Sequence, residues 1–151
     1  MTQRLALLAT ALWWGSLPAI GFMAVPLLFK HLPTPAMAGQ MAARLFTAQT
    51  WLSVACGVTL LLCMRKQALA GEEKARAAIV FIVLGLLLAL LVEFGVAPRI
   101  VARQNLPLWH SLGTGMYALQ WLCAGWLLCK IKQTPACCVD DAARLPSRPS
   151  S

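Results

Sequence analysis

Residues 5–29 form an apolar run without a single charged side chain, and this run most constrains what the chain can fold into. As a helix it would be about 37 Å long, enough to cross a bilayer core of about 30 Å. The run is too long for the apolar region of a signal peptide and continues past the weak cleavage candidate at Ala19. We therefore expect an uncleaved transmembrane helix, kinked where Pro18 and Pro26 remove backbone donors.

Three further apolar runs follow, and composition favours the same interpretation for them. Of the 151 residues, 60% are hydrophobic and 12% are charged, whereas soluble domains are about half apolar and about a quarter charged. A chain this short cannot bury so much apolar surface in water. The sequence predicts an all-α membrane protein, a four-transmembrane-helix bundle over residues 1–132. Its spans are expected at about 5–29, 41–64, 77–97 and 110–129.

The ends of these runs carry start and stop signals. Thr34 followed by Pro35 is typical of a helix start, and Pro98 predicts the end of the third span. After residue 132 the chain becomes polar and rich in proline, which predicts a disordered cytoplasmic tail over residues 133–151. We find no convincing internal repeat.

Lysine and arginine are distributed unequally between the two ends of the predicted spans. Four of the 13 basic residues fall on one side, namely Lys30, Arg44, Arg99 and Arg103, and the other nine fall on the side of the termini. The positive-inside rule then predicts that the N- and C-termini are cytoplasmic. The net charge of +8 does not indicate nucleic acid, because the basic residues separate apolar runs and form no stripe. The expected partner is the lipid bilayer.

Glu93 is the most informative polar residue, because it interrupts the third apolar run. A carboxylate inside a span costs free energy and usually faces a partner or the bundle interior. Arg44 lies at a similar depth in the second span, and Arg99 is a second candidate partner. Two hypotheses stay open: a structural ion pair, and a proton or ion site.

Two histidines, His31 and His110, also map to the side opposite the termini. Together with Glu93 they supply ligand types suited to zinc or copper, and either histidine alone suits haem iron. Hydrogen bonding at the membrane interface is the simpler interpretation, so no cofactor is expected by default. The adjacent pair Cys137 and Cys138 could bind a soft metal as thiolates, but is more simply incidental.

Small residues on the predicted helices indicate close helix packing. The candidate positions are Gly15, Gly21, Gly57 and Gly115. The chain contains no nucleotide-binding loop, no nucleophile elbow and no HExxH motif, which argues against an enzyme.

Short motifs along the chain resemble a known family. They are Trp13–Gly21, Val25–Phe29, Ala43–Phe46, Pro98–Arg99 and Leu108–Ser111. Their order resembles that of bacterial members of the transmembrane-protein-205-like family, which is catalogued as domain of unknown function 4149. The resemblance implies a small multi-helix membrane protein without an established activity. The fold is similar to that of copper-resistance-type membrane proteins and of a four-helix haem-associated relative.

The leading functional hypothesis is a non-enzymatic, multi-pass membrane protein that acts in transport, in metal tolerance or in assembly of a membrane complex. A homo-oligomer is compatible with each of these roles. The alternative is a haem- or copper-binding membrane redox protein that uses His31 and His110.

Overall fold

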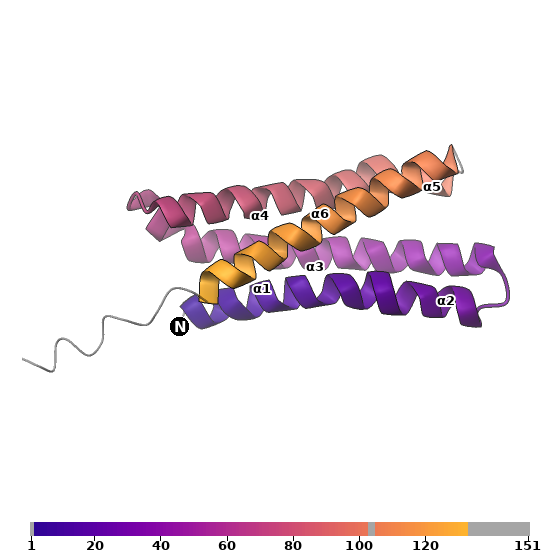
Figure 1. The fold of residues 1–151 in the computed structure, drawn as a ribbon, viewed down its shortest axis with the longest axis horizontal. Coiled ribbons are helices and arrows are strands. Elements are labelled where there is room, and N and C mark those ends of the chain that lie inside the picture. The colour runs from indigo at the N-terminus through magenta and orange to yellow at the C-terminus, as the bar shows by residue number, and fades with distance from the viewer. Residues whose placement is uncertain (1, 103–104, 133–151) are drawn as a thin grey trace, which may run out of the picture.

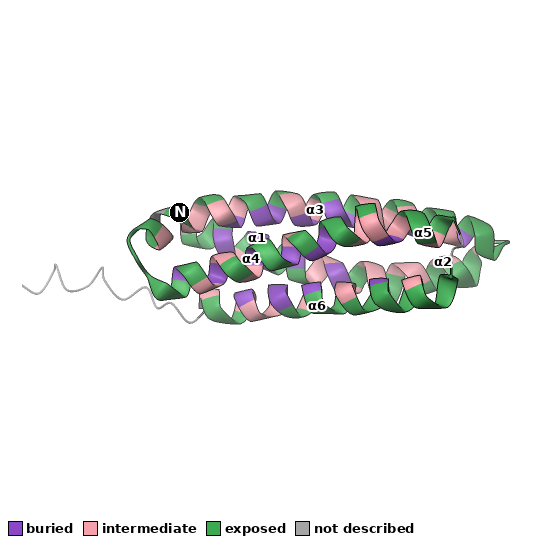
Figure 2. Ribbon diagram, turned by 90° about the horizontal axis from the view of Figure 1, so that it is seen from above, coloured by how far each residue is buried: buried purple, intermediate pink, exposed green. Residues whose placement is uncertain are grey.

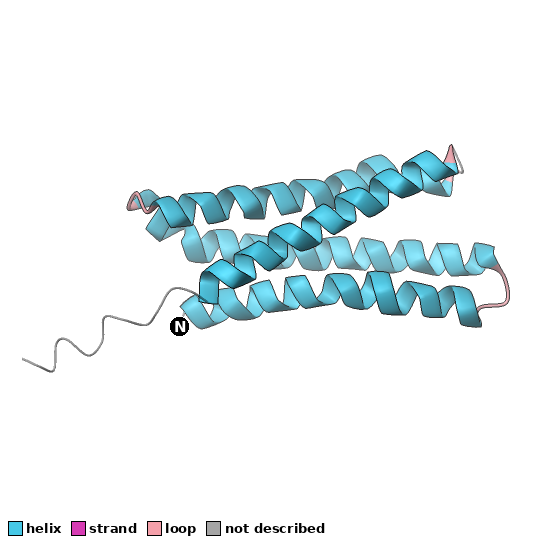
Figure 3. Ribbon diagram, viewed as in Figure 1, coloured by secondary structure: helices cyan, strands magenta, loops and turns pink. Residues whose placement is uncertain are grey.

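The computed structural model describes residues 2–102 and 105–132, which form helices joined by short turns (Figures 1 and 3). The predicted tail at 133–151 lies outside the described residues. In chain order the elements are α1 (Thr2–Pro18), η1 (Ala19–Ala24), α2 (Val25–His31), α3 (Pro35–Leu69), α4 (Glu73–Leu91), η2 (Val92–Val96), α5 (Ala97–Val101) and α6 (Leu106–Lys132). The described part is therefore all-helical, as the sequence predicts.

The long helices pack as a four-cornered bundle. Helix α1 packs against α3 and α6, and α4 packs against the same two helices. This places α1 diagonally opposite α4, and α3 diagonally opposite α6. Helices α2 and α5 lie at the same end of the bundle, opposite the N-terminus (Figure 1). Sequential helices are thus neighbours, because short connections leave little choice of partner.

Three helical segments are long and apolar enough to cross a membrane: Gln3–His31, Pro35–Arg65 and Glu73–Val101. The expected fourth span needs correction. Helix α6 has 27 residues and is long enough, but within the described residues it is not among the sufficiently apolar segments. Polar and weakly apolar side chains such as Tyr117, Gln120 and Trp121 lower its mean hydropathy.

Two π-helical segments, η1 and η2, widen the helix in the first and third spans. The sequence predicted a kink in the first of these spans and the end of the helix in the third. Pro26 and Pro98 each lie in the first turn of the α-helix that follows a π-segment. The third span therefore continues past Pro98 to Val101, because proline is tolerated at a helix start. The interval from Pro26 to Pro98 also separates Pro35 from Pro107. The short helix after each π-segment, and the long helix that follows the next turn, therefore have prolines near their starts at the same spacing.

The bundle buries one continuous core and exposes apolar side chains on its outside (Figure 2). The largest fully buried apolar side chains are Trp13, Leu17, Leu60, Ile82 and Leu127. Phe22 and Phe94, in η1 and η2, are 74% and 67% exposed. Such an apolar exterior is costly in water and ordinary in lipid.

Candidate functional site

Glu93 lies in η2, inside a helix of membrane-spanning length, and its carboxylate meets a neighbouring helix. Thr47 Oγ1 on α3 donates a hydrogen bond of 2.7 Å to Glu93 Oε1. The same hydroxyl contacts the Ala43 carbonyl at 3.2 Å. Glu93 is partly buried, and 2.7 Å is a short distance for a hydrogen bond from a hydroxyl to a carboxyl oxygen. One oxygen of the Glu93 carboxyl group is thus bonded to Thr47, and the second oxygen has no hydrogen bond to any described residue.

The two arginines predicted as partners of Glu93 have other surroundings among the described residues. Arg44 is exposed on α3, one turn before Thr47, and within the described residues it forms no ion pair. Arg99 Nη1 donates to the Gly95 carbonyl at 3.1 Å, and its guanidinium lies 4.3 Å from the centre of the Trp109 ring. The structure thus brings Glu93 to Thr47, and the pairing of Glu93 with Arg44 or Arg99 stays a prediction.

A second polar group occupies the centre of the bundle. Gln49 Nε2 donates to Ser16 Oγ at 2.9 Å and lies 3.4 Å from Ser53 Oγ. Gln120 Nε2 donates to Ser53 Oγ at 3.1 Å. The two glutamines and Ser53 are almost fully buried. This central amide cluster therefore joins α1, α3 and α6 by hydrogen bonds where lipid offers no alternative partner.

Burial of one atom of the central amide cluster costs free energy. Among the described residues, Gln49 Oε1 is buried without a hydrogen-bond partner, and so are the indole nitrogens of Trp13 and Trp121. A buried polar atom without a partner costs about 1–3 kcal/mol. The sequence reading overlooked this cluster, although amide side chains at Gln49 and Gln120 inside apolar runs were its visible signal.

The histidines lie at the end of the bundle that carries α2 and α5 (Figure 1). His31 Nδ1 lies 3.0 Å from the Leu27 carbonyl, and because a carbonyl oxygen only accepts, Nδ1 is the donor in this hydrogen bond. His110 is exposed in α6. No group of three or more His, Cys, Asp or Glu side chains lies together in the described part of the chain. Cys137 and Cys138 lie outside that part.

The glycines fall into two classes according to what a β-carbon would meet. At Gly57 it would lie 2.6 Å from Leu86 Cδ2, and at Gly21 it would lie 3.2 Å from Tyr117 Cε1. At Gly15 and Gly115 it would meet nothing within 4 Å among the described residues. The tightest contacts also include positions not anticipated from sequence: Gly85 against Trp13 at 2.9 Å and Gly125 against Trp14 at 2.9 Å.

Tyr117 connects α6 to the beginning of η1. Its hydroxyl donates to the Leu17 carbonyl at 2.9 Å, and its ring meets Phe46 edge-on with centroids 5.4 Å apart. The Tyr117 hydroxyl thus bonds the last turn of α1, directly before η1, whereas the Thr47 hydroxyl bonds Glu93 within η2. Wide turns of this kind are common at functional sites.

The comparisons with known proteins give one match. The profile of a family described as a domain of unknown function, DUF4149, matches residues 8–106, about two thirds of the chain. No curated protein and no solved structure matches.

Proposed function

Because the chain belongs to the DUF4149 family, which carries no activity with it, we propose a function from the geometry: a multi-pass transport protein in which Glu93 binds a proton or a monovalent cation. The observation that carries the proposal is the hydrogen bond of 2.7 Å between Thr47 and the Glu93 carboxylate inside a span. Ionisable groups within spans commonly mark ion and proton pathways.

The position of Glu93 in η2 supports a binding role. Interrupted transmembrane helices often supply binding sites in transporters, because the disturbed backbone lets polar groups face a ligand. Glu93 has one oxygen on Thr47 and forms no ion pair within the described residues. A bound proton or cation would therefore neutralise a charge that otherwise lacks a countercharge in lipid.

The proposal includes four spans in a bacterial cytoplasmic membrane, with both termini cytoplasmic. Helix α6 serves as the fourth span because it packs against two apolar spans and has sufficient length. The orientation follows from the excess of lysine and arginine at the end that carries the termini. Alkaline phosphatase should be inactive when fused after residue 132 and active when inserted between Val101 and Leu106. The reverse pattern would contradict the orientation.

Ion flux into proteoliposomes tests the role of Glu93. We would trap a pH-sensitive dye inside the vesicles, impose a membrane potential with potassium and valinomycin, and repeat the experiment with sodium gradients and a sodium-sensitive dye. The wild-type protein should raise proton or sodium flux above that of empty vesicles. Glu93→Gln should lose this flux, because the amide cannot take up a proton or neutralise a cation.

The control is Glu72→Gln, the same substitution at an exposed residue beside the α3–α4 turn. It should leave the flux unchanged. Thr47→Ser keeps the hydroxyl and should retain flux, whereas Thr47→Val should reduce it. Flux that persists in Glu93→Gln would refute the ion site, and an inactive wild type would favour a role in membrane-complex assembly or a homo-oligomer.

A second proposal, haem or copper binding by His31 and His110, is favoured by one contact. His31 Nδ1 donates to the Leu27 carbonyl, which is how metal-ligating histidines are commonly oriented by a second group. Protein purified in mild detergent should then show a Soret band or stoichiometric copper, lost in His31→Ala and His110→Ala. A colourless, metal-free wild type would end this proposal.

A further inference from the structure

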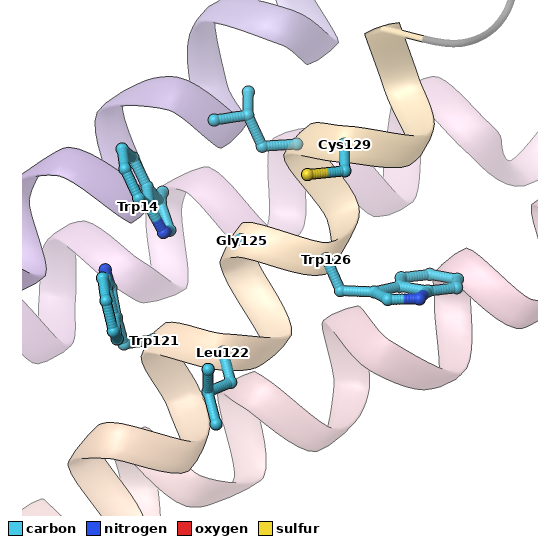
Figure 4. A pocket seen from close by; sticks show the side chains of 7 residues that line it. Trp14, Trp121, Leu122, Gly125, Trp126 and Cys129 are labelled. Atoms are coloured by element: carbon cyan, nitrogen blue, oxygen red, sulfur yellow. The ribbon is translucent and has the colours of Figure 1, made fainter.

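A crevice opens on the outside of the bundle between α1 and α6. It has a volume of about 300 Å³ and an almost wholly apolar lining. Figure 4 shows Trp14 and Trp121 side by side at one wall, with Gly125 between them and Cys129. Leu122 is 60% exposed at its edge. This volume is at the lower end of small-molecule pockets, so it suits an extended apolar segment.

Ring stacking holds the walls of the crevice in place. Trp14 and Trp121 are stacked with centroids 5.9 Å apart, and Trp126 stacks on Phe81 of α4 at 4.0 Å. Gly125 permits this arrangement, because a β-carbon there would lie 2.9 Å from Trp14 Nε1. The crevice is therefore formed before a ligand arrives, which lowers the entropic cost of binding.

A positive charge lies beside one lining residue of the crevice. Lys130 follows Trp126 by one helical turn, and its ammonium lies 5.5 Å from the centre of that ring. Arg4 is exposed near the start of α1, and the start of α1 adjoins the end of α6 (Figure 1). An apolar crevice with a cation next to its lining is complementary to a molecule with an apolar chain and an anionic head.

We propose that this crevice binds an anionic glycerophospholipid, with one acyl chain lying along α6 against Leu122 and the stacked Trp14 and Trp121 rings, and with the phosphate at Lys130 beside Trp126. Basic side chains near a membrane surface attract anionic lipids, and tryptophan favours the boundary between headgroups and acyl chains. The site is separate from Glu93, which lies near the opposite end of the bundle.

Quenching of tryptophan emission by brominated acyl chains tests this proposal. The protein, carrying Trp51→Phe to remove an indole that is 60% exposed elsewhere, is reconstituted into zwitterionic vesicles. A small and equal fraction of brominated phosphatidylglycerol or brominated phosphatidylcholine is then added. The anionic lipid should quench more strongly at equal fraction. Lys130→Gln should lower this preference about fivefold, the effect of one basic side chain at the surface.

Two matched variants make the result specific. Lys130→Arg should keep the preference, and Lys74→Gln, at an exposed lysine on the α4 helix, should leave it unchanged. Equal quenching by both lipids would overturn the anionic site. A Lys130→Gln protein with an undiminished preference would overturn the role of Lys130. Absence of quenching by either lipid would overturn lipid binding and point to a second copy of the chain covering the crevice.

Discussion

Replacing Gly85 by alanine should destabilise the bundle, because the new methyl group would enter the space of the most buried tryptophan. A β-carbon at Gly85 would lie 2.9 Å from Trp13 Cη2 and 3.0 Å from Cζ2. Trp13 is 0% exposed, and its rigid ring cannot rotate away without displacing neighbours. Helix α4 and helix α1 would therefore have to separate.

The magnitude follows from two opposing effects. Overpacking of a core by one methyl group usually costs about 1–3 kcal/mol. Alanine gains about 0.5–1 kcal/mol over glycine inside a helix. For Gly85→Ala we expect a net loss of about 1–2 kcal/mol, since the rigid ring places the cost toward the upper end of its range.

Alanine substitutions at two other glycines provide stability changes with which the loss at Gly85 can be compared. At Gly57 the close atoms are Cδ2, Cδ1 and Cγ of Leu86, and this side chain is only partly buried and can move away by a change of its χ1 rotamer. Gly57→Ala should cost less, about 0.5 kcal/mol or below after the gain in helix propensity. At Gly115 a β-carbon meets nothing within 4 Å, so Gly115→Ala should be neutral or stabilising. Of the three variants, we expect Gly115→Ala to be the most stable, Gly57→Ala to be intermediate and Gly85→Ala to be the least stable.

The assay is reversible unfolding in mixed detergent or by steric trapping, with free energies of unfolding compared among the variants. Trp13→Phe removes the two ring atoms that the methyl group would meet. The double variant Trp13→Phe/Gly85→Ala should therefore lose less stability than the sum of its single variants. If Gly85→Ala is as stable as Gly115→Ala, the proposed close packing of Trp13 on α4 is refuted.

Two further stability predictions rest on single hydrogen bonds. A double-mutant cycle between Thr47→Val and Glu93→Gln should show a coupling of about 0.6 kcal/mol, the average for hydrogen bonds in membranes, and no more than about 1.7 kcal/mol. The parallel cycle between Arg44→Gln and Glu93→Gln tests the predicted ion pair: coupling would support it, and additivity would contradict it. Tyr117→Phe should cost about 1 kcal/mol by leaving the Leu17 carbonyl without the hydroxyl, and a full-stability variant in the same unfolding assay would show that the carbonyl is satisfied otherwise.

The all-helical class and three of the expected spans could be predicted from the apolar runs. Length and lack of charge determine a span almost independently of its neighbours, because lipid is the same on every side. The same rule predicted the fourth span. The length of an uncharged run takes no account of polar side chains such as Tyr117 and Gln120, which lower the mean hydropathy of α6. These side chains face other helices in the structure.

The partners of the site residues could not be predicted in the same way. Helices that are apolar on nearly all faces give no amphipathic stripe to show which side faces inward. Glu93 was identified because a charge in a span is conspicuous, whereas Thr47, its hydrogen-bond partner, is an ordinary residue on α3. The sequence predicted a kink at Pro26 and a helix end at Pro98. Sequence alone does not distinguish a broken helix from one in which a π-segment precedes the proline.

The contacts across the bundle have a consequence for any route through it. Trp13 on α1 reaches Gly85 on the diagonally opposite α4, and Gln120 on α6 is hydrogen-bonded to Ser53 on the diagonally opposite α3. Both diagonals are therefore bridged, and the central axis is plugged by an indole ring and two side-chain amides. If Glu93 holds an ion, as we propose, these side chains leave that ion no straight axial path through the described part of the bundle. The proposed transport would then require the helices to rearrange, as in a carrier.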